Sequence, residues 1–177
     1  MADVEIQASG LRTEVLLVII ATGAGLIENL LPRPLPFVKP GLANIVTAAA
    51  VWKYGTMSGI RVNLLRSTGA AIFLGTLATP SYILSLGGGA VSAAAMGSVR
   101  RFLSVPAMSA AGSIASLMAQ LILAGWLLPG LPLRPLVMPV VLWGALSGVL
   151  TGTAAAALMN RGFPWVGKGV DSSRPPE

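Results

Sequence analysis

The chain has 177 residues, of which 54% are hydrophobic and 10% are charged, and its formal net charge is +6. Together with a mean hydropathy of +0.79, this composition excludes most water-soluble classes and leaves no room for a separate soluble catalytic domain. The absence of cysteine and histidine excludes disulfides and the usual haem, iron-sulfur and metal ligands. We therefore expect an all-α integral membrane protein, a compact bundle of about six transmembrane helices.

The domain organisation is expected to have three parts. Residues 1–13 form a cytoplasmic N-terminal segment, residues 14–160 the membrane domain, and residues 161–177 a disordered cytoplasmic tail. The first helix is predicted from Glu14 to Leu31 and ends at a proline-rich loop, since proline lacks an amide donor. The second, from Pro40 to Trp52, is short, and it spans the bilayer only if it continues to about Tyr54 or lies in a thinned region.

The remaining helices are predicted from apolar runs bounded by prolines and arginines. A polar interruption containing Lys53, Arg61, Asn63 and Arg66 is expected to precede the third helix. The third to sixth helices are then predicted at about Leu64–Ala78, Tyr82–Val99, Pro106–Leu128 and Leu136–Asn160.

The distribution of basic residues predicts the orientation in the membrane. With six spans, one side holds Arg12, Lys53, Arg61, Arg66, Arg100, Arg101, Arg161, Lys168 and Arg174, and the other holds only Arg33, Lys39 and Arg134. Short positive loops resist translocation, so we expect both termini in the cytoplasm and the protein in the cytoplasmic (inner) membrane. The basic residues are scattered rather than gathered with aromatic residues, so no nucleic-acid partner is expected.

Polar residues near the membrane are candidates for function, because burying them there is costly. Glu28 and Asn29 lie at the outer end of the first predicted helix, and Asn44 lies at the start of the second. With Lys39 they form a polar cluster at the outer mouth that is suited to a ligand head group. The alternative interpretation is that Glu28 pairs with Lys39 or Arg33 at the interface.

Two further polar residues and two small ones complete the candidates. Arg66 either extends to anionic lipid at the cytoplasmic surface or is a buried charge facing the bundle. Gln120 either makes an interhelical hydrogen bond or lines a pocket. Ala21 and Gly25 lie four apart on one face of the first helix, which suits docking onto a partner helix. We expect no catalytic or metal site, since the sequence has only six acidic residues.

Two passages resemble a known family. The first is Lys39-Pro40-Gly41-Leu42-Ala43-Asn44-Ile45-Val46-Thr47, and the second runs from Leu65-Arg66 through Thr79-Pro80-Ser81-Tyr82 to Gly87-Gly88-Gly89. They are similar to the Gx transporter family, also labelled heptaprenyl diphosphate synthase component I, over about residues 15–160. The family commonly has a His-Asn pair shortly before a Gly-Gln in the fifth span, and this sequence retains only Gln120.

The resemblance implies a six-helix bundle similar to the substrate-binding S components of energy-coupling factor (ECF) transporters. Glu28 and Asn44 would then bind a small molecule near the outer face, and Ala21 and Gly25 would contact an ECF-type coupling protein. The alternative function is a quinone-binding or scaffolding subunit of an electron-transfer complex, since relatives resemble proteins encoded beside flavin-transferring enzymes and NusG-like domains. Its cofactor would be quinone or flavin. Synthase activity is not expected, since no acidic Asp-rich motif is present.

Overall fold

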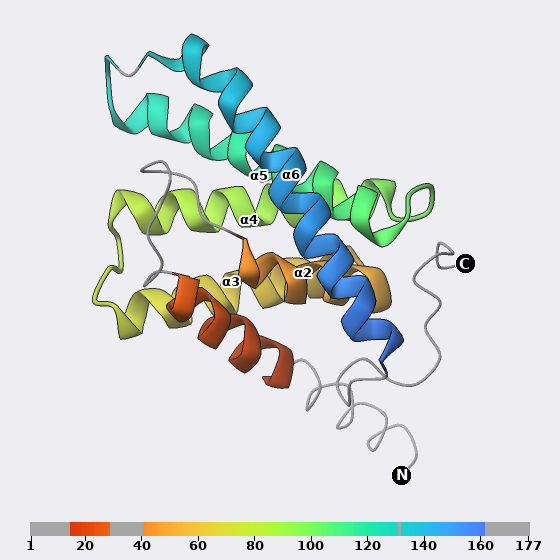
Figure 1. Ribbon diagram of the computed structural model, residues 1–177. Coiled ribbons are helices and arrows are strands. Elements are labelled where there is room, and N and C mark those ends of the chain that lie inside the picture. Colours follow the sequence, from red (N-terminus) through yellow and green to blue (C-terminus); the bar gives the residue numbers. More distant parts are fainter. Residues whose placement is uncertain (1–14, 29–40, 131, 162–177) are drawn as a thin grey trace.

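The computed structural model describes residues 15–28, 41–130 and 132–161, which form six helices and no strand (Figure 1). The first helix is Val15–Glu28, and the others are α2 Leu42–Tyr54, α3 Thr56–Phe73, α4 Pro80–Val99, α5 Val105–Leu127 and α6 Leu133–Asn160. The predicted all-α class and the number of helices are confirmed. The predictions for residues 1–14, 29–40 and 162–177 lie outside the described residues.

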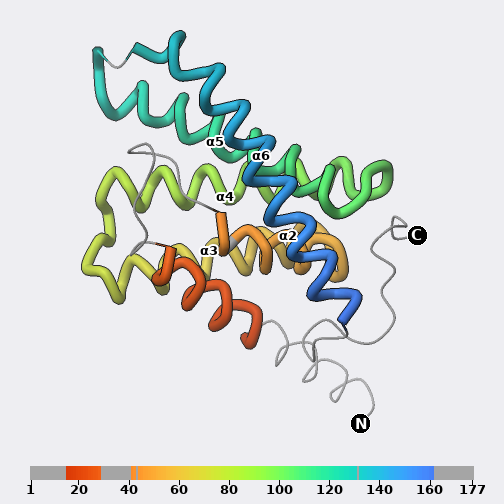
Figure 2. The backbone as a smooth tube through the Cα atoms, viewed as in Figure 1, coloured from red at the N-terminus to blue at the C-terminus, as the bar shows by residue number. Residues whose placement is uncertain are grey.

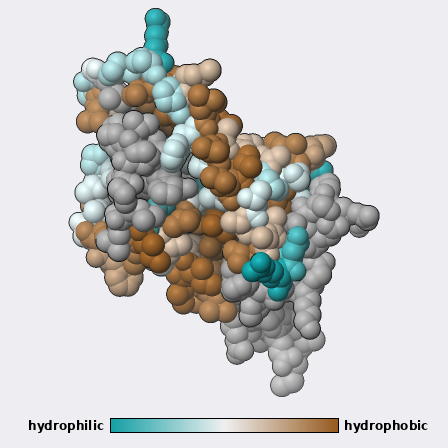
Figure 3. Space-filling view, in the orientation of Figure 1, coloured by the Kyte–Doolittle hydropathy of each residue, from teal (hydrophilic) through white to brown (hydrophobic). Residues whose placement is uncertain are grey.

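The described helices have the character of a membrane protein. Three of them, α4, α5 and α6, are long and apolar enough to cross a bilayer. Large apolar side chains are exposed on the outside, including Trp126 at 86% and Phe102 at 81%, and apolar patches cover much of the face in Figure 3. Water-soluble monomers rarely expose apolar surface on this scale, so the outside of the bundle is adapted to lipid.

The third helix differs from its predicted bounds. It begins at Thr56 and ends at Phe73, rather than running from Leu64 to Ala78. The expected polar interruption therefore lies inside the helix. A single residue, Gly55, separates it from α2, and its φ of 94° gives a tight reversal that a side chain would disfavour. The Gly55 N–H donates to the carbonyl of Val51 and so caps α2.

Helix α2 lies at the centre of the bundle. It contacts α3, α4, α5 and α6, and the tube in Figure 2 shows α6 running obliquely past it. Its residues from Val46 to Trp52 are buried, which is why it has no polar face. Its 13 residues give a length of about 20 Å, shorter than a hydrocarbon core of about 30 Å.

Close packing of α5 against α6 depends on three glycines spaced four apart on α6. A Cβ atom on Gly144, Gly148 or Gly152 would lie 3.1, 2.5 or 2.6 Å from a backbone Cα atom of α5. Without a hydrophobic force between helices in lipid, such close backbone approach supplies the van der Waals energy that holds them together.

The small residues of the first helix also pack within the chain. Ala21 is fully buried, Gly25 is buried, and Thr22 lies against Gly69 of α3. The lipid-facing side of this helix carries large residues instead, among them Ile19 and Ile27. The two residues expected to dock a partner are thus buried within the chain, and their docking role stays a prediction.

Replacing Gly148 with alanine is expected to destabilise the bundle by about 1–3 kcal/mol, because the new methyl group meets the rigid backbone of α5. Thermal unfolding in mild detergent measures the effect. The matched control is Gly23→Ala in the first helix, where a Cβ meets nothing within 4 Å and helix propensity favours alanine. Equal melting temperatures for the two variants would contradict the packing described for α5 and α6.

Candidate functional site

A cavity of about 500 Å³ lies at one end of the bundle. Its walls come from the C-terminal ends of the first helix and α3, the N-terminal ends of α2 and α4, the second half of α5, and the middle of α6. Because consecutive helices run in opposite directions, all these ends lie on the same side. The cavity therefore belongs to the end that carries the N-terminus of α2, the turn after α3 and the C-terminus of α5.

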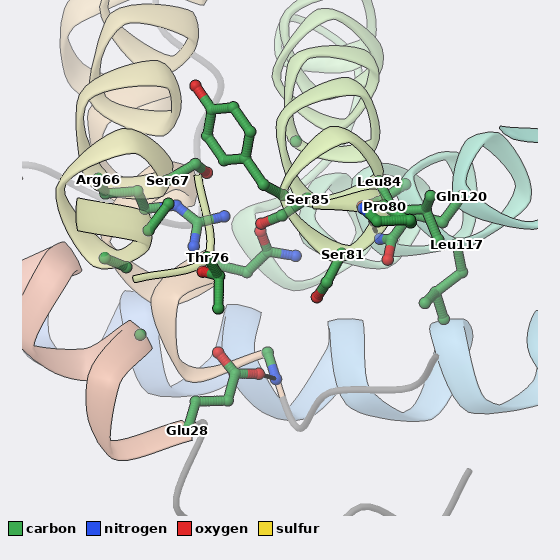
Figure 4. Close-up of a pocket in the computed structure, with 18 of the residues that line it drawn as sticks. Glu28, Arg66, Ser67, Thr76, Pro80, Ser81, Leu84, Ser85, Leu117 and Gln120 are labelled. Atoms are coloured by element: carbon green, nitrogen blue, oxygen red, sulfur yellow. Dashed lines mark hydrogen bonds between the residues drawn. The ribbon is translucent and has the colours of Figure 1, made fainter. Parts of the chain in front are cut away.

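The structure brings four of the predicted ligand-binding residues to this cavity. Glu28, Asn44, Arg66 and Gln120 all line it, although they come from four different helices (Figure 4). Gly25, predicted for docking, also lines it. The other two candidates, Asn29 and Lys39, lie outside the described residues.

Glu28 is held at the N-terminal end of α2. Its side chain is only 3% exposed, and its Oε1 atom accepts a hydrogen bond from the backbone N–H of Gly41, the residue that caps α2. Gly41 has a φ of 86°, a conformation that directs its N–H toward the first helix and that glycine adopts without strain. A carboxylate is stabilised at this position by the dipole of α2 as well as by the hydrogen bond.

Arg66 enters the cavity from α3 and is fixed by Asn63, one turn earlier. Its Nη2 atom donates to Asn63 Oδ1 at 2.8 Å, and Asn63 Nδ2 donates to the carbonyl of Leu86 at 3.4 Å. Asn63 is fully buried, and the space it fills exists because position 89 is glycine. Arg66 therefore lies within α3 rather than in the expected polar interruption, and of the two interpretations given for it the charge facing the bundle is the one that the structure favours.

Two polar groups on neighbouring residues of α3 have no hydrogen-bond partner within the described part of the chain. They are Arg66 Nε and Ser67 Oγ, and Ser67 is only 6% exposed. Arg66 also interacts electrostatically with Glu28, although Asn63, not Glu28, accepts its hydrogen bond. Figure 4 shows Arg66 and Glu28 entering the space from different helices.

The wall opposite α3 is formed by α5 and carries amide and hydroxyl groups. Gln120 Nε2 donates to Ser116 Oγ at 3.1 Å, and Asn44 Nδ2 donates to Ser113 Oγ at 3.2 Å. Gly88 on α4 leaves the space that the Gln120 side chain occupies. The triple-glycine run therefore accommodates polar side chains from α3 and α5 rather than binding phosphate.

The sequence analysis did not identify the hydroxyl groups of the cavity. Ser67, Ser113, Ser116 and Tyr82 all line it, and Tyr82 also shares a hydrogen bond of 3.1 Å with Thr68. The spacing of Ser113, Ser116 and Gln120 places them on one helical face, a signal that was available in the sequence.

The opposite end of the bundle is basic. Lys53 closes α2, Arg100 and Arg101 follow α4, and Arg161 follows α6. At the cavity end, Arg134 is the exposed basic residue among those described. Among the described residues, basic side chains are therefore more numerous at the end opposite the cavity, although Arg66, which was predicted for that side, lines the cavity.

The chemical groups of this cavity are able to bind a small molecule. They offer one cation, one anion, amides and hydroxyls, with apolar walls formed by residues such as Leu84 and Leu117. A mostly apolar pocket with a few fixed polar groups is typical of small-molecule sites, and its volume lies within their range of about 300–1,000 Å³.

Comparison with known proteins gives one match. The family model described as heptaprenyl diphosphate synthase component I matches residues 17–158, which include the five helices α2–α6 almost entirely and most of the first. No curated protein and no solved structure matches the chain.

Replacing Asn63 with alanine is expected to destabilise the protein by about 2–4 kcal/mol, because it leaves a buried guanidinium without its acceptor. The cost should be smaller in an Arg66→Met background, where no charge remains to be satisfied. Thermal unfolding of the two single variants and the double variant forms the cycle that measures this coupling. Additive effects would contradict the role of Asn63 as the support of Arg66.

Proposed function

The chain belongs to the heptaprenyl diphosphate synthase component I family, and from this premise we propose that it is a membrane solute-binding component, similar to an S component of ECF transporters. It binds a small molecule in the cavity that Glu28, Asn44, Arg66 and Gln120 line. That convergence of four costly polar side chains on one space is the observation that carries the proposal.

The direction of access follows from the charges of the two ends. The cavity lies at the end opposite Lys53, Arg100, Arg101 and Arg161. Because basic residues mark the cytoplasmic side of inner-membrane proteins, the cavity faces outward. The molecule is therefore taken from the outer side, and both termini lie in the cytoplasm.

The lining favours binding over the other functions considered. Prenyl diphosphate synthesis requires clustered carboxylates that hold Mg²⁺ and diphosphate, whereas Glu28 is the single acidic residue in residues 15–161 of the sequence. A quinone carries no charge, so it would leave Glu28 and Arg66 in the cavity without a charged partner. Because the family is described as a component, we further propose that the chain works with partner subunits, such as ECF-type coupling proteins.

The proposal is tested by filling the cavity. Ala70 of α3 lines it, and an Ala70→Phe variant is expected to abolish binding while the fold persists. The wild type, purified in mild detergent, is screened by thermal shift against water-soluble metabolites and its own co-purifying small molecules. A true ligand at about 100 times its Kd should add about 2.7 kcal/mol of stability.

The matched control is Ile72→Phe, two positions later on the same helix, where the side chain is 60% exposed to lipid. This variant should bind like the wild type. A ligand that stabilises Ala70→Phe as strongly as Ile72→Phe would show that the cavity is not its site. A wild type that no compound stabilises would overturn the proposed function.

Reporter fusions test the orientation. Alkaline phosphatase fused after Glu177 is expected to be inactive, because the C-terminus is cytoplasmic. Inserted after Gly130, in the exposed connection between α5 and α6, it should be active. Green fluorescent protein at the same sites should give the reverse pattern. Phosphatase activity at the C-terminus would place the cavity on the cytoplasmic side.

A further inference from the structure

We propose that the cavity selects a zwitterion: a small molecule with a carboxylate that binds Arg66 and Ser67 and an ammonium group that binds Glu28. This inference rests on the proposed function and names the chemical class of its ligand. It follows from the two opposite charges, the unpartnered donors between them, and the polarity of the remaining walls.

The first step is the separation of the charges. Glu28 is fixed by Gly41 and Arg66 by Asn63, and no ion pair joins the two side chains within the described residues. They nevertheless interact electrostatically and line the same cavity. A direct pair would be the ordinary way to satisfy two charges in a membrane protein. Opposite charges held apart across a cavity instead leave room for a molecule that bridges them.

The second step concerns the donors of α3. Arg66 Nε and Ser67 Oγ lack partners, and both residues line the cavity. A carboxylate has two oxygens and about four acceptor sites, which is enough to accept hydrogen bonds from two donors. The other unpartnered buried groups of the described chain, on Ser58, Ser92 and Trp143, do not line the cavity.

The third step is the net charge. Glu28 and Arg66 already balance one another, so a purely anionic or purely cationic ligand would bring an uncompensated charge into a low-dielectric site. A zwitterion adds no net charge and gives each protein charge a close partner. The amide and hydroxyl groups of Asn44, Ser113 and Gln120, with the apolar wall beside them, then surround the body of the ligand.

Three sets of matched probes test the inference. Each set contains an amino acid, its decarboxylated amine and its deaminated acid. The first set is leucine, isoamylamine and 4-methylpentanoate, and the second is phenylalanine, phenethylamine and 3-phenylpropionate. The third is tryptophan, tryptamine and indole-3-propionate. Calorimetry on the purified full chain measures their Kd. In at least one set, the amino acid is expected to bind about 10-fold to 100-fold more tightly than either partner, because each lost charge-assisted contact costs about 1.5–3 kcal/mol.

Two charge-neutralising variants should reverse the preference. Of the three members of a probe set, the Glu28→Gln variant is expected to bind the deaminated acid most tightly. The Arg66→Gln variant is expected to bind the decarboxylated amine most tightly. Ser67→Ala removes a hydroxyl that makes no hydrogen bond within the described part of the chain, so the melting temperature of the variant should be unchanged. The Ser67→Ala variant should bind the amino acid and the acid several-fold more weakly than the wild type, and its Kd for the amine should be unchanged. Ser92→Ala, an unpartnered buried serine away from the cavity, is the control and should change no Kd.

Several outcomes would overturn the inference. A wild type that prefers the acid or the amine has no zwitterion site, and unchanged preferences in Glu28→Gln would exclude an ammonium group at Glu28. If no probe binds but the metabolite screen finds a ligand that Ala70→Phe abolishes, the proposed function stands. In that case the zwitterion inference fails. If neither experiment finds a ligand, both fail.

Discussion

The placement of Arg66, half-buried inside the bundle, is the constraint on which the rest of the cavity depends. Placing a guanidinium inside a membrane bundle costs free energy unless fixed polar groups surround it. Here each of these groups depends in turn on a neighbouring residue. Asn63, which accepts the hydrogen bond from Arg66, is fully buried, and it fits only because α4 has glycine at position 89. Glu28 supplies the compensating charge from the first helix. Through Asn63 the position of Arg66 on α3 is thereby linked to α4.

Close packing provides the space for these polar groups. The glycines of α6 bring its backbone against α5, and those of α4 accommodate Asn63 and Gln120. In lipid, helices associate through such contacts and through interhelical hydrogen bonds, since apolar burial alone gives no preference for protein over lipid. The small residues therefore have two separate effects. On α6 they hold the bundle together, and on α4 they leave room for the polar side chains of the cavity.

The sequence was sufficient for much of the fold and part of the site. The ends of α4, α5 and α6 were close to those predicted because prolines and arginines bound their apolar runs. Helix α3 was misplaced because hydropathy treats Arg61 and Arg66 as loop residues, although a helix accepts a cation that faces lipid head groups or a polar cavity. Glu28, Asn44 and Gln120 were identified by the cost of burying them.

The other residues that line the cavity could not be identified from the cost of burying a polar side chain. Ser67 and Ser113 are small hydroxyl residues, which are common in membrane helices for packing alone, so their types carry no signal until the cavity is seen. Ala21 and Gly25 show the same limit, because a small-residue face does not reveal whether its neighbour belongs to the same chain. Only the three-dimensional arrangement shows that α3 and the cavity lie against that face.

The cavity lies at the N-terminus of the short helix α2. At about 20 Å this helix is shorter than a hydrocarbon core of about 30 Å. Gly41 and Asn44, at that end, line the cavity. The N-terminus of a helix ending inside a membrane presents unpaired amides and a positive dipole, which transporters with broken helices use to hold anionic groups. Here Glu28 occupies this position, so the protein supplies its own anion there. The anionic group of a ligand is thereby left to Arg66 and Ser67 on the facing helix.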